Sequence, residues 1–309
     1  MTITSSHSAI TATGLRKSFG DQLVLDGIDL AVPQGTVFAL LGPNGAGKTT
    51  IIQILSTLIG ADGDPDAVRA VIGVTGQFSA VDNLLTGEEN LHLMADLRHL
   101  DRREGRRRPA ELLEQFDLVE AASKPAATYS GGMKRRLDLA MGLVGDPRII
   151  FLDEPTAGLD PRSRRGMWQI IRELVAGGVT ILLTTQYLEE ADELADRIAL
   201  LDHGRLVAEG TADELKRRIP GGHIRLEFAS ADGLDAAART LGAPTRDNEA
   251  LTLQIPSDGS VTSLRALLDR LDGQSIEVGG LSIHTPDLDD VFLTLTGQPD
   301  NENEKEPVA

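Results

Sequence analysis

The chain of 309 residues carries 30 basic and 47 acidic side chains, for a formal net charge of −17, and 41% of its residues are hydrophobic. This length suits about two domains with real cores. The acidic balance argues against nucleic acid as a main partner, because phosphate backbones are bound by basic faces. The absence of cysteine excludes disulfides and cysteine-based metal sites and fits a reducing compartment. No apolar run approaches the roughly 18 residues that cross a bilayer, so a partner would have to supply any membrane-spanning helices.

Residues 1–8 are polar and predict a flexible leader, after which strand-like patterns run from Ile10 to Leu41. The turn-forming pairs and triplets in this region are Asp26-Gly27 and Pro33-Gln34-Gly35. They predict three separate strands, at 23–25, 28–32 and 36–41.

A complete G-x-x-x-x-G-K-T phosphate-binding loop runs from Gly42 to Thr49. It follows the apolar run 37–41 and precedes a helical pattern that we expect to end near Gly60, and this strand–loop–helix context supports the motif. Glycines let backbone N–H groups turn toward a polyphosphate, and the helix N-terminus adds positive potential. Lys48 is placed to reach the β- and γ-phosphates, and the Thr49 hydroxyl to hold Mg²⁺. A Gly-rich structural turn is the alternative, which the lysine, the threonine and both flanks disfavour. The loop residues assigned to the nucleotide are Gly42, Pro43, Asn44, Gly45, Ala46, Gly47, Lys48, Thr49 and Thr50.

After a turn at 61–65 and a short strand at 71–75, residues 84–128 are expected to be mostly helical. The stretch 86–89 predicts a capping box that opens the first helix, and a second helix is expected at 110–118. Between them lies the arginine-rich run 102–108. It indicates either contact with an acidic partner segment or anionic lipid, or a solvated, loosely ordered connection, which is the more usual fate of a charge run.

Two further stretches carry chemistry. Ser130 is a natural N-cap of an amphipathic helix, and Gly131 and Gly132 leave its first N–H groups open to an anion. The buried strand 149–152 ends in Asp153, which can bind Mg²⁺ directly or through water, and in Glu154, which can orient or deprotonate an attacking water. An acidic helix cap is the alternative for this pair, and the phosphate loop disfavours it.

From residue 148 onward strands and helices alternate, which predicts a parallel sheet with flanking helices. The strands are expected at 149–152 and 179–184, the helices at 163–175 and 188–195, and a hairpin at 198–208. A capping box at 211–214 opens a helix that ends near the Pro/Gly cluster 220–222, the expected domain boundary. Beyond it, strands at 223–229, 250–255 and 275–283 and helices at 233–241, 260–271 and 288–296 fit a small α+β domain, followed by an acidic, disordered tail at 298–309.

Taken together these motifs resemble the ATP-binding cassette (ABC) ATPases, because they stand in that family's order. The order is loop 42–49, Gln77, Ser130-Gly131-Gly132, Asp153-Glu154, Asp160 and a polar residue, Gln186, after a strand. In finer detail, the stretches 74–78, 129–138, 183–192 and 288–293 resemble the ATP-binding subunits of daunorubicin-resistance drug exporters, and the resemblance covers about 10–297.

This resemblance implies an α/β P-loop fold of ABC type, with a parallel core sheet, an antiparallel β subdomain and a helical subdomain at about 84–145. The ATPase domain would span 9–220 and a C-terminal α+β accessory domain 221–297. Relatives carry one further strand near 61–66, so the antiparallel sheet beside the nucleotide is expected to be thinner here.

By the family's roles, Phe19 would stack on adenine, and Gln77 would touch Mg²⁺ and the coupling element of a membrane-spanning subunit. Ser130, Gly131 and Gly132 would bind the γ-phosphate held by a second copy, and Asp160 would cross the same interface. ATP would then hold a dimer together until hydrolysis releases it.

Most of the superfamily has histidine where this chain has Gln186, and the drug-resistance branch has glutamine there as well. Glutamine offers a donor and an acceptor but does not titrate. The alternative is that Gln186 only caps the helix beginning near Tyr187. The expected catalytic residues are Glu154, Gln186 and Lys48, and the expected Mg²⁺ ligands are Thr49, Gln77 and Asp153.

The sequence therefore predicts the ATP-hydrolysing subunit of an ABC exporter of drug-like or antibiotic molecules, with ATP and Mg²⁺ as its ligands. It would form a homodimer docked on separate permease subunits at the cytoplasmic face of the membrane, without a nucleic-acid partner. A soluble ABC ATPase acting on a macromolecule is one alternative, although such proteins usually join two cassettes or insert coiled coils. A regulatory nucleotide-binding protein with little hydrolysis is another.

Overall fold

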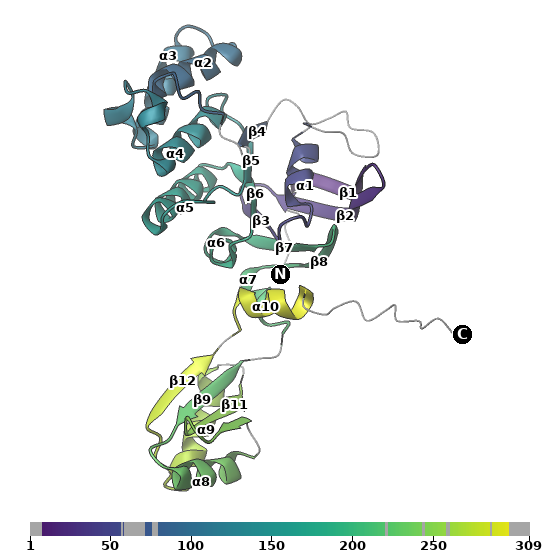
Figure 1. Cartoon of the computed structure of the whole chain (residues 1–309), viewed down its shortest axis with the longest axis vertical. Helices are drawn as coiled ribbons and strands as arrows, with labels where there is room; N and C mark the ends of the chain where they lie inside the picture. Colours follow the sequence, from purple (N-terminus) through teal and green to yellow (C-terminus); the bar gives the residue numbers. More distant parts are fainter. Residues whose placement is uncertain are drawn as a thin grey trace, which may run out of the picture. The chain divides into compact units, whose positions relative to one another are not determined.

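The computed structural model of the chain divides into two compact units, with the division after Ala212. Each unit has a sheet and a core of its own (Figure 1). The expected boundary at 220–221 lies outside the described residues. The structure describes residues 8–56, 58, 72–75, 80–219, 222–242, 245–257, 260–284 and 286–296.

The main sheet of the first unit has six strands within the described residues, in the order β4-β5-β6-β3-β7-β8. All neighbouring pairs are parallel except β7 and β8. Strands β3, β5 and β6 are buried along their whole length, as expected for parallel strands covered on both faces. The strands are β3 (Val37–Leu41), β4 (Ile72–Thr75), β5 (Ile149–Asp153), β6 (Thr180–Thr185), β7 (Arg197–Asp202) and β8 (Arg205–Gly210). The predicted parallel core sheet is confirmed.

An antiparallel hairpin of β1 (Ser8–Phe19) and β2 (Gln22–Pro33) forms the second sheet of this unit. Ser8, placed in the leader by the sequence, already belongs to β1. The predicted turn at Asp26-Gly27 is wrong, because β2 is one continuous strand. Leu15 pairs with Ile28 and Arg16 with Asp26, so Gly27, at φ 74°, is an extra residue in a bulge. The expected loss of a strand near 61–66 falls outside the described residues.

The helical part of the first unit contains α2 (Gly87–Leu97), α3 (Glu104–Gln115), the single 3-10 turns η1 (Val119–Ala121) and η2 (Ala126–Thr128), and α4 (Gly131–Gly142). The predicted capping box is present: Thr86 accepts from the Glu89 N–H while the Glu89 carboxylate accepts from the Thr86 N–H. The expectation of a loose connection at 102–108 is wrong, because α3 begins at Glu104. Arg107 pairs with Glu104 and Glu111, one helical turn to either side, and these pairs support the helix.

The remaining helices of this unit flank the main sheet. They are α1 (Lys48–Leu55), α5 (Pro161–Ala176) and α6 (Leu188–Leu194). The core gathers β2, β3, β5, β7 and α1, with Phe38, Ile51 and Phe151 fully buried within it. This packing fixes the loop between β3 and α1 against the ends of the parallel strands.

The second unit has a four-stranded antiparallel sheet within its described residues, in the order β10-β11-β9-β12. Its core joins the sheet to α8 and α9 through Leu226, Leu234, Leu253 and Leu271. The elements are α7 (Ala212–Lys216, which starts at the division), β9 (His223–Glu227), α8 (Ala231–Leu241), β10 (Thr245–Asp247), β11 (Thr252–Pro256), α9 (Val261–Asp272), β12 (Gly280–His284) and α10 (Leu288–Thr296). Of these only β10 has no predicted counterpart. Among the described helices of either unit, none combines the length and the apolar character that a bilayer span requires.

Candidate nucleotide site

The loop between β3 and α1 depends on its glycines. Gly45 and Gly47 have φ values of 83° and 103°, which side-chain-bearing residues rarely adopt. A Cβ on Gly42 would lie 2.2 Å from the carbonyl oxygen of Leu201, and one on Gly47 would lie 2.6 Å from the Leu25 side chain. Gly47 is also the N-cap of α1, and no side chain caps the first turn of that helix. The loop therefore presents uncapped N–H groups at a helix N-terminus, which is the arrangement that binds anions.

Lys48 opens α1 and is almost fully buried, with 5% of its surface exposed. Its Nζ donates to the carbonyl oxygens of Gly42 at 2.7 Å and Pro43 at 3.0 Å, so the loop curls around the ammonium group. Burial lowers the pKa of Lys48, although the charges of Glu154 and Asp153 act in the opposite direction. A buried ammonium group that donates to neutral carbonyl oxygens can exchange those bonds for stronger charge-assisted bonds to an anion.

Asp153 ends β5 and is 2% exposed. Its Oδ1 accepts from the Thr49 hydroxyl at 3.2 Å and from the Thr184 hydroxyl at the end of the neighbouring strand β6. A hydroxyl and a carboxylate at this separation fit a Mg²⁺ ion that takes its other oxygen ligands from phosphates and water. Within the described residues, no group of three or more acidic, histidine or cysteine side chains is placed to hold a metal ion.

Glu154 follows Asp153 in a left-handed backbone conformation, with φ 47°. Its N–H donates to both the carbonyl and the hydroxyl oxygen of Thr184, each at 3.1 Å. These bonds hold the strained residue against β6. The carboxylate is half-buried and accepts no hydrogen bond from any described residue, so it is available to a water molecule.

Gln186 directly follows β6, and its side chain forms no hydrogen bond within the described part of the chain. The Thr185 hydroxyl accepts from the Tyr187 N–H at 3.0 Å and so shapes the turn that carries Gln186. The N-cap of α6 is Tyr187, and no side-chain cap is formed there. The alternative of a capping role for Gln186 is therefore wrong in this structure.

The parallel order of the sheet brings these pieces together. β3 lies beside β6, and β6 beside β5. The phosphate loop, Gln186 and the pair Asp153-Glu154 thus follow the carboxyl ends of three adjacent strands, where open α/β sheets place their ligands.

Ser130, Gly131 and Gly132 stand apart from this group. They form the N-terminus of α4, with the Ser130 hydroxyl accepting from the Met133 N–H at 3.2 Å. In Figure 1, α4 and α1 lie on either side of β5. Ser130 and Gly131 are exposed, and a Cβ on Gly131 would meet nothing within 4 Å, whereas one on Gly132 would lie 2.7 Å from the Ser163 hydroxyl of α5. No atom of the phosphate loop is among the neighbours that a Cβ at either glycine would meet.

Asp160 caps α5, accepting from the Arg162 and Ser163 N–H groups at 3.0 Å and from the Ser163 hydroxyl at 2.6 Å. The hydrogen bonds from Ser163 lower the pKa of Asp160. The carboxylate is on an exposed turn, so it is available to another molecule.

Phe19 is 51% exposed at the end of β1, opposite Gln22 in the hairpin, with the Lys17 ammonium 5.4 Å from its ring centroid. The hairpin reaches the phosphate loop through Leu25, whose side chain limits the space at Gly47. An exposed ring there is available for stacking on a planar group. Gln77, the last of the predicted site residues, lies outside the described residues.

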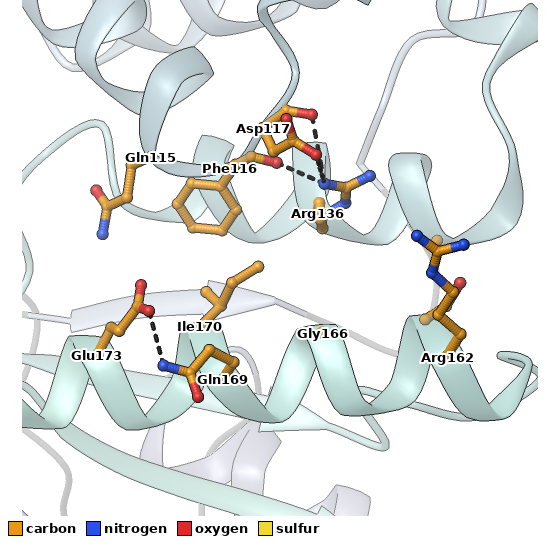
Figure 2. A pocket seen from close by; sticks show the side chains of 11 residues that line it. Gln115, Phe116, Asp117, Arg136, Arg162, Gly166, Gln169, Ile170 and Glu173 are labelled. Atoms are coloured by element: carbon orange, nitrogen blue, oxygen red, sulfur yellow. Dashed lines mark hydrogen bonds and ion pairs between the residues drawn. The ribbon is translucent and has the colours of Figure 1, made fainter.

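A cavity of about 440 Å³ lies elsewhere, between α5 and the segment joining α3 to α4. Figure 2 shows Arg136 directed at Phe116 and Asp117 on one side, with Gln169 and Glu173 of α5 on the other. No residue of the phosphate loop or of the ends of β5 and β6 lines it, and of the predicted site residues only Gly132 does.

Thr184 and Arg135 were not singled out from the sequence. Thr184 carries a hydroxyl group at the end of an apolar strand, and this pattern in the sequence could have marked it as a site residue. The Arg135 guanidinium donates to backbone carbonyls next to Glu154, and no local pattern marks that contact.

A parallel sheet with a glycine loop, a buried lysine, and a hydroxyl and two carboxylates at its carboxyl edge defines a P-loop nucleotide-binding ATPase. The family model described as ABC transporter matches residues 25–157. The daunorubicin resistance ATP-binding protein DrrA2 of Streptomyces coeruleorubidus is 45% identical, over 97% of this chain and 99% of its own length. The chain belongs to the ABC transporter family, as one of its ATP-binding ATPase subunits.

Other relatives agree with this assignment. The daunorubicin/doxorubicin resistance ATP-binding protein DrrA of Streptomyces peucetius is 45% identical, over 99% of this chain and 98% of its own length. The Nod factor export ATP-binding protein I of Sinorhizobium fredii is 38% identical, over 95% of this chain and 87% of its own. A solved ATP-binding subunit of an ABC transporter superposes with a TM-score of 0.60 at 30% identity, over 67% of this chain and 92% of the other.

Proposed function

We propose that this chain binds ATP with Mg²⁺ and hydrolyses it between two facing copies, and thereby powers the export of drug-like or antibiotic molecules through separate membrane-spanning subunits. The observation that supports this best is the group at the carboxyl edge of the sheet, where Lys48, Asp153 and Glu154 converge on the uncapped N-terminus of α1. The soluble and regulatory alternatives are not favoured, because the relatives are named for drug resistance and for export.

Phosphate binding falls to the loop and to Lys48. The Lys48 Nζ bonds to Gly42 and Pro43 can be exchanged for stronger charge-assisted bonds to the β- and γ-phosphates. The backbone N–H groups from Asn44 to Thr50 supply further donors at the start of α1. Phe19 provides an exposed ring for the adenine.

Thr49 and Asp153, together with Gln77, are the proposed residues for Mg²⁺. A bound Mg²⁺ would neutralise charge on the β- and γ-phosphates. The Thr184 hydroxyl fixes the Asp153 carboxylate from the side of β6, so the oxygen that accepts from Thr49 is already oriented.

Glu154 is the proposed general base, because its carboxylate is unpaired within the described residues and its backbone is fixed by Thr184. Gln186, on the adjacent strand end, is proposed to orient the attacking water and the γ-phosphate through neutral hydrogen bonds. Lys48 stabilises the charge that develops on the phosphate oxygens.

A second copy is proposed to complete the site. Ser130, Gly131 and Gly132 form a helix N-terminus whose first two residues are exposed, and a Cβ at either glycine would meet no atom of the nucleotide loop. Offered by a facing copy, it would close the open side of the γ-phosphate and exclude water. Asp160, on its exposed turn, would lie at the same interface.

The cargo and partners follow from the relatives. Those named for daunorubicin and doxorubicin resistance match nearly the whole chain, so a drug-like molecule is the proposed cargo, carried by permease subunits at the cytoplasmic face of the membrane. We assign 9–220 to the ATPase domain, with its helical subdomain at about 84–145, and 221–297 to an accessory domain that supports assembly.

The decisive experiment compares the parent chain with Lys48→Ala and Glu154→Gln. Lys48→Ala is expected to lose ATP binding by at least about tenfold, because it removes the only loop cation that faces the phosphates among the described residues. Glu154→Gln is expected to bind ATP normally and to lose turnover, because the amide keeps the shape of the base and loses its basicity. Phosphate release, equilibrium ATP binding and sedimentation with ATP and Mg²⁺ measure these outcomes.

Glu154→Gln should also accumulate an ATP-bound dimer, since hydrolysis no longer releases it. Parent-level hydrolysis in Glu154→Gln would remove Glu154 from the role of base. A variant that stays monomeric with saturating ATP and Mg²⁺ would contradict the facing-dimer arrangement.

A further inference from the structure

Arg135, near the start of α4, hydrogen-bonds to the backbone at the end of β5 and in the loop that follows it. Its Nε donates to the carbonyl oxygen of Pro155 at 2.9 Å, and its Nη2 donates to those of Asp153 at 2.9 Å and Glu154 at 3.3 Å. One guanidinium group therefore holds three consecutive peptide carbonyls, including that of the proposed base. No lysine can reproduce this planar fork of donors.

The same guanidinium is paired with Asp138, one helical turn further along α4. The Arg135 Nη1 lies 3.3 Å from the Asp138 Oδ2, and Asp138 is 4% exposed. Burial lowers the pKa of Arg135, and the Asp138 charge is the largest influence that opposes the shift. Two buried charges that face each other are coupled, so removing one changes the environment of the other.

Asp138 also forms a hydrogen bond with a different segment of the chain. Its Oδ1 accepts from the Ala80 N–H at 2.8 Å. Ala80 is the first described residue after the stretch that contains Gln77. The Arg135–Asp138 pair therefore joins the chain at Ala80 to the loop that carries Glu154.

The helix that carries the pair also begins with Ser130-Gly131-Gly132. A short, regular helix moves as a rigid piece, so a displacement at its N-terminus reaches Arg135 and the carbonyls it holds. The backbone of Glu154 is thus tied to Ala80 and to the helix whose N-terminus, under the proposed function, meets a second copy.

We infer that Arg135 and Asp138 are positioning residues that set the Glu154 carboxylate for hydrolysis by linking its loop to α4 and to Ala80. The inference rests on the proposed function. The contacts of the pair described above go to the loop after β5 and to Ala80, and none of them goes to the phosphate loop, so we expect the pair to govern turnover more than ATP affinity. A misplacement of a catalytic group by about 1 Å lowers turnover by about a hundredfold.

The test uses the full-length chain with Arg135→Gln, Arg135→Lys, Asp138→Asn and the double variant Arg135→Gln/Asp138→Asn. Arg136→Gln is the matched control. Arg136 is the next residue of the same helix and also donates to backbone carbonyls, but to Phe116 and Asp117 on the cavity side (Figure 2). The measurements are kcat and KM for ATP, equilibrium ATP binding, and the melting temperature of each variant.

Arg135→Gln is expected to lower kcat by about ten- to a hundredfold while ATP affinity stays within about threefold. Arg135→Lys should recover only part of kcat, since it keeps the charge that faces Asp138 and loses the fork. The double variant should lose no more than the worse single variant, because the two side chains are coupled. Arg136→Gln should keep kcat within about twofold.

Parent-like kcat in Arg135→Gln, an equal loss in Arg136→Gln, or a parallel fall of ATP affinity would overturn the inference. If Arg135→Gln does not fold, Arg135→Lys and the nearly isosteric Asp138→Asn decide by the same split between kcat and affinity. The proposed function fails separately, if the parent chain does not hydrolyse ATP or Glu154→Gln does not stop turnover.

Discussion

Gln186 shows how much depends on one side chain at the nucleotide. It stands at the end of β6 without a hydrogen bond from the described residues, and it does not cap α6. We expect Gln186→Ala to lower kcat more than it changes ATP affinity, because the lost contact acts mainly in the transition state. Steady-state ATPase rates and equilibrium binding of ATP measure the two effects.

Gln186→His should retain activity, because neutral imidazole keeps one donor and one acceptor. Its activity should be highest above about pH 6.5 and fall below it, since protonation removes the acceptor. Gln169→Ala, an exposed glutamine on α5 that bonds to Glu173, is the control and should match the parent. Parent-level turnover in Gln186→Ala would exclude a role in hydrolysis.

The residues of the candidate site differ in how far the sequence reveals them. Lys48, Thr49 and the glycines form one continuous motif whose spacing alone indicates their chemistry. Asp153 and Glu154 are marked by the apolar strand before them. No local pattern in the sequence identifies Arg135 and Asp138. Their contacts depend on how α4 packs against the loop after β5 and against Ala80.

At the scale of the elements, the contact between α4 and α5 separates the roles of two adjacent glycines. Gly131→Ala should leave the isolated chain as stable as the parent or up to about 1 kcal/mol more stable, because alanine favours helix and its Cβ meets nothing. Gly132→Ala should destabilise the chain, because its Cβ would press on Ser163. Thermal unfolding without nucleotide compares them.

Under the proposed function Gly131→Ala loses the ATP-bound dimer when it is placed on the Glu154→Gln background, since its added methyl group enters the open face presented to the second copy. A Gly131→Ala chain that still dimerises with ATP would contradict the proposed use of this helix N-terminus. Sedimentation with ATP and Mg²⁺ gives the answer.

The predicted helices and strands agree with the structure where one face of the element is apolar. They differ where charge or backbone geometry determines the local structure. The apolar periodicity of the sequence does not predict the start of α3, because the first turns of this helix are arginine-rich. Ion pairs of Arg107 with Glu104 and Glu111 stabilise them. The bulge at Gly27 has the residues of a turn. β10 is three exposed residues long and carries no apolar signal. Strand order depends on pairing between distant segments, which no local pattern encodes.

The net charge of −17 acts on the molecule as a whole. Two facing copies repel each other, and salt screens that repulsion, since the Debye length falls from about 30 Å at 0.01 M to about 10 Å at 0.1 M. We expect the ATP-bound dimer of Glu154→Gln to tighten as salt rises over this range, by sedimentation equilibrium at fixed ATP and Mg²⁺. A dimer that weakens with salt would indicate that oppositely charged patches dominate the interface.

The left-handed backbone at Glu154 has a consequence for the heat tolerance of the chain. A residue with a Cβ at φ 47° raises the free energy of the folded state by roughly 1–2 kcal/mol, and glycine does not. Glu154→Ala and Glu154→Gly both remove the carboxylate, so their difference isolates the backbone. The glycine variant should melt about 2–4 °C above the alanine variant, and equal melting temperatures would show that the conformation is unstrained. If the glycine variant is the more stable one, selection for heat resistance alone would favour glycine at position 154 and so an inactive enzyme. Only the demand for hydrolysis keeps a glutamate there.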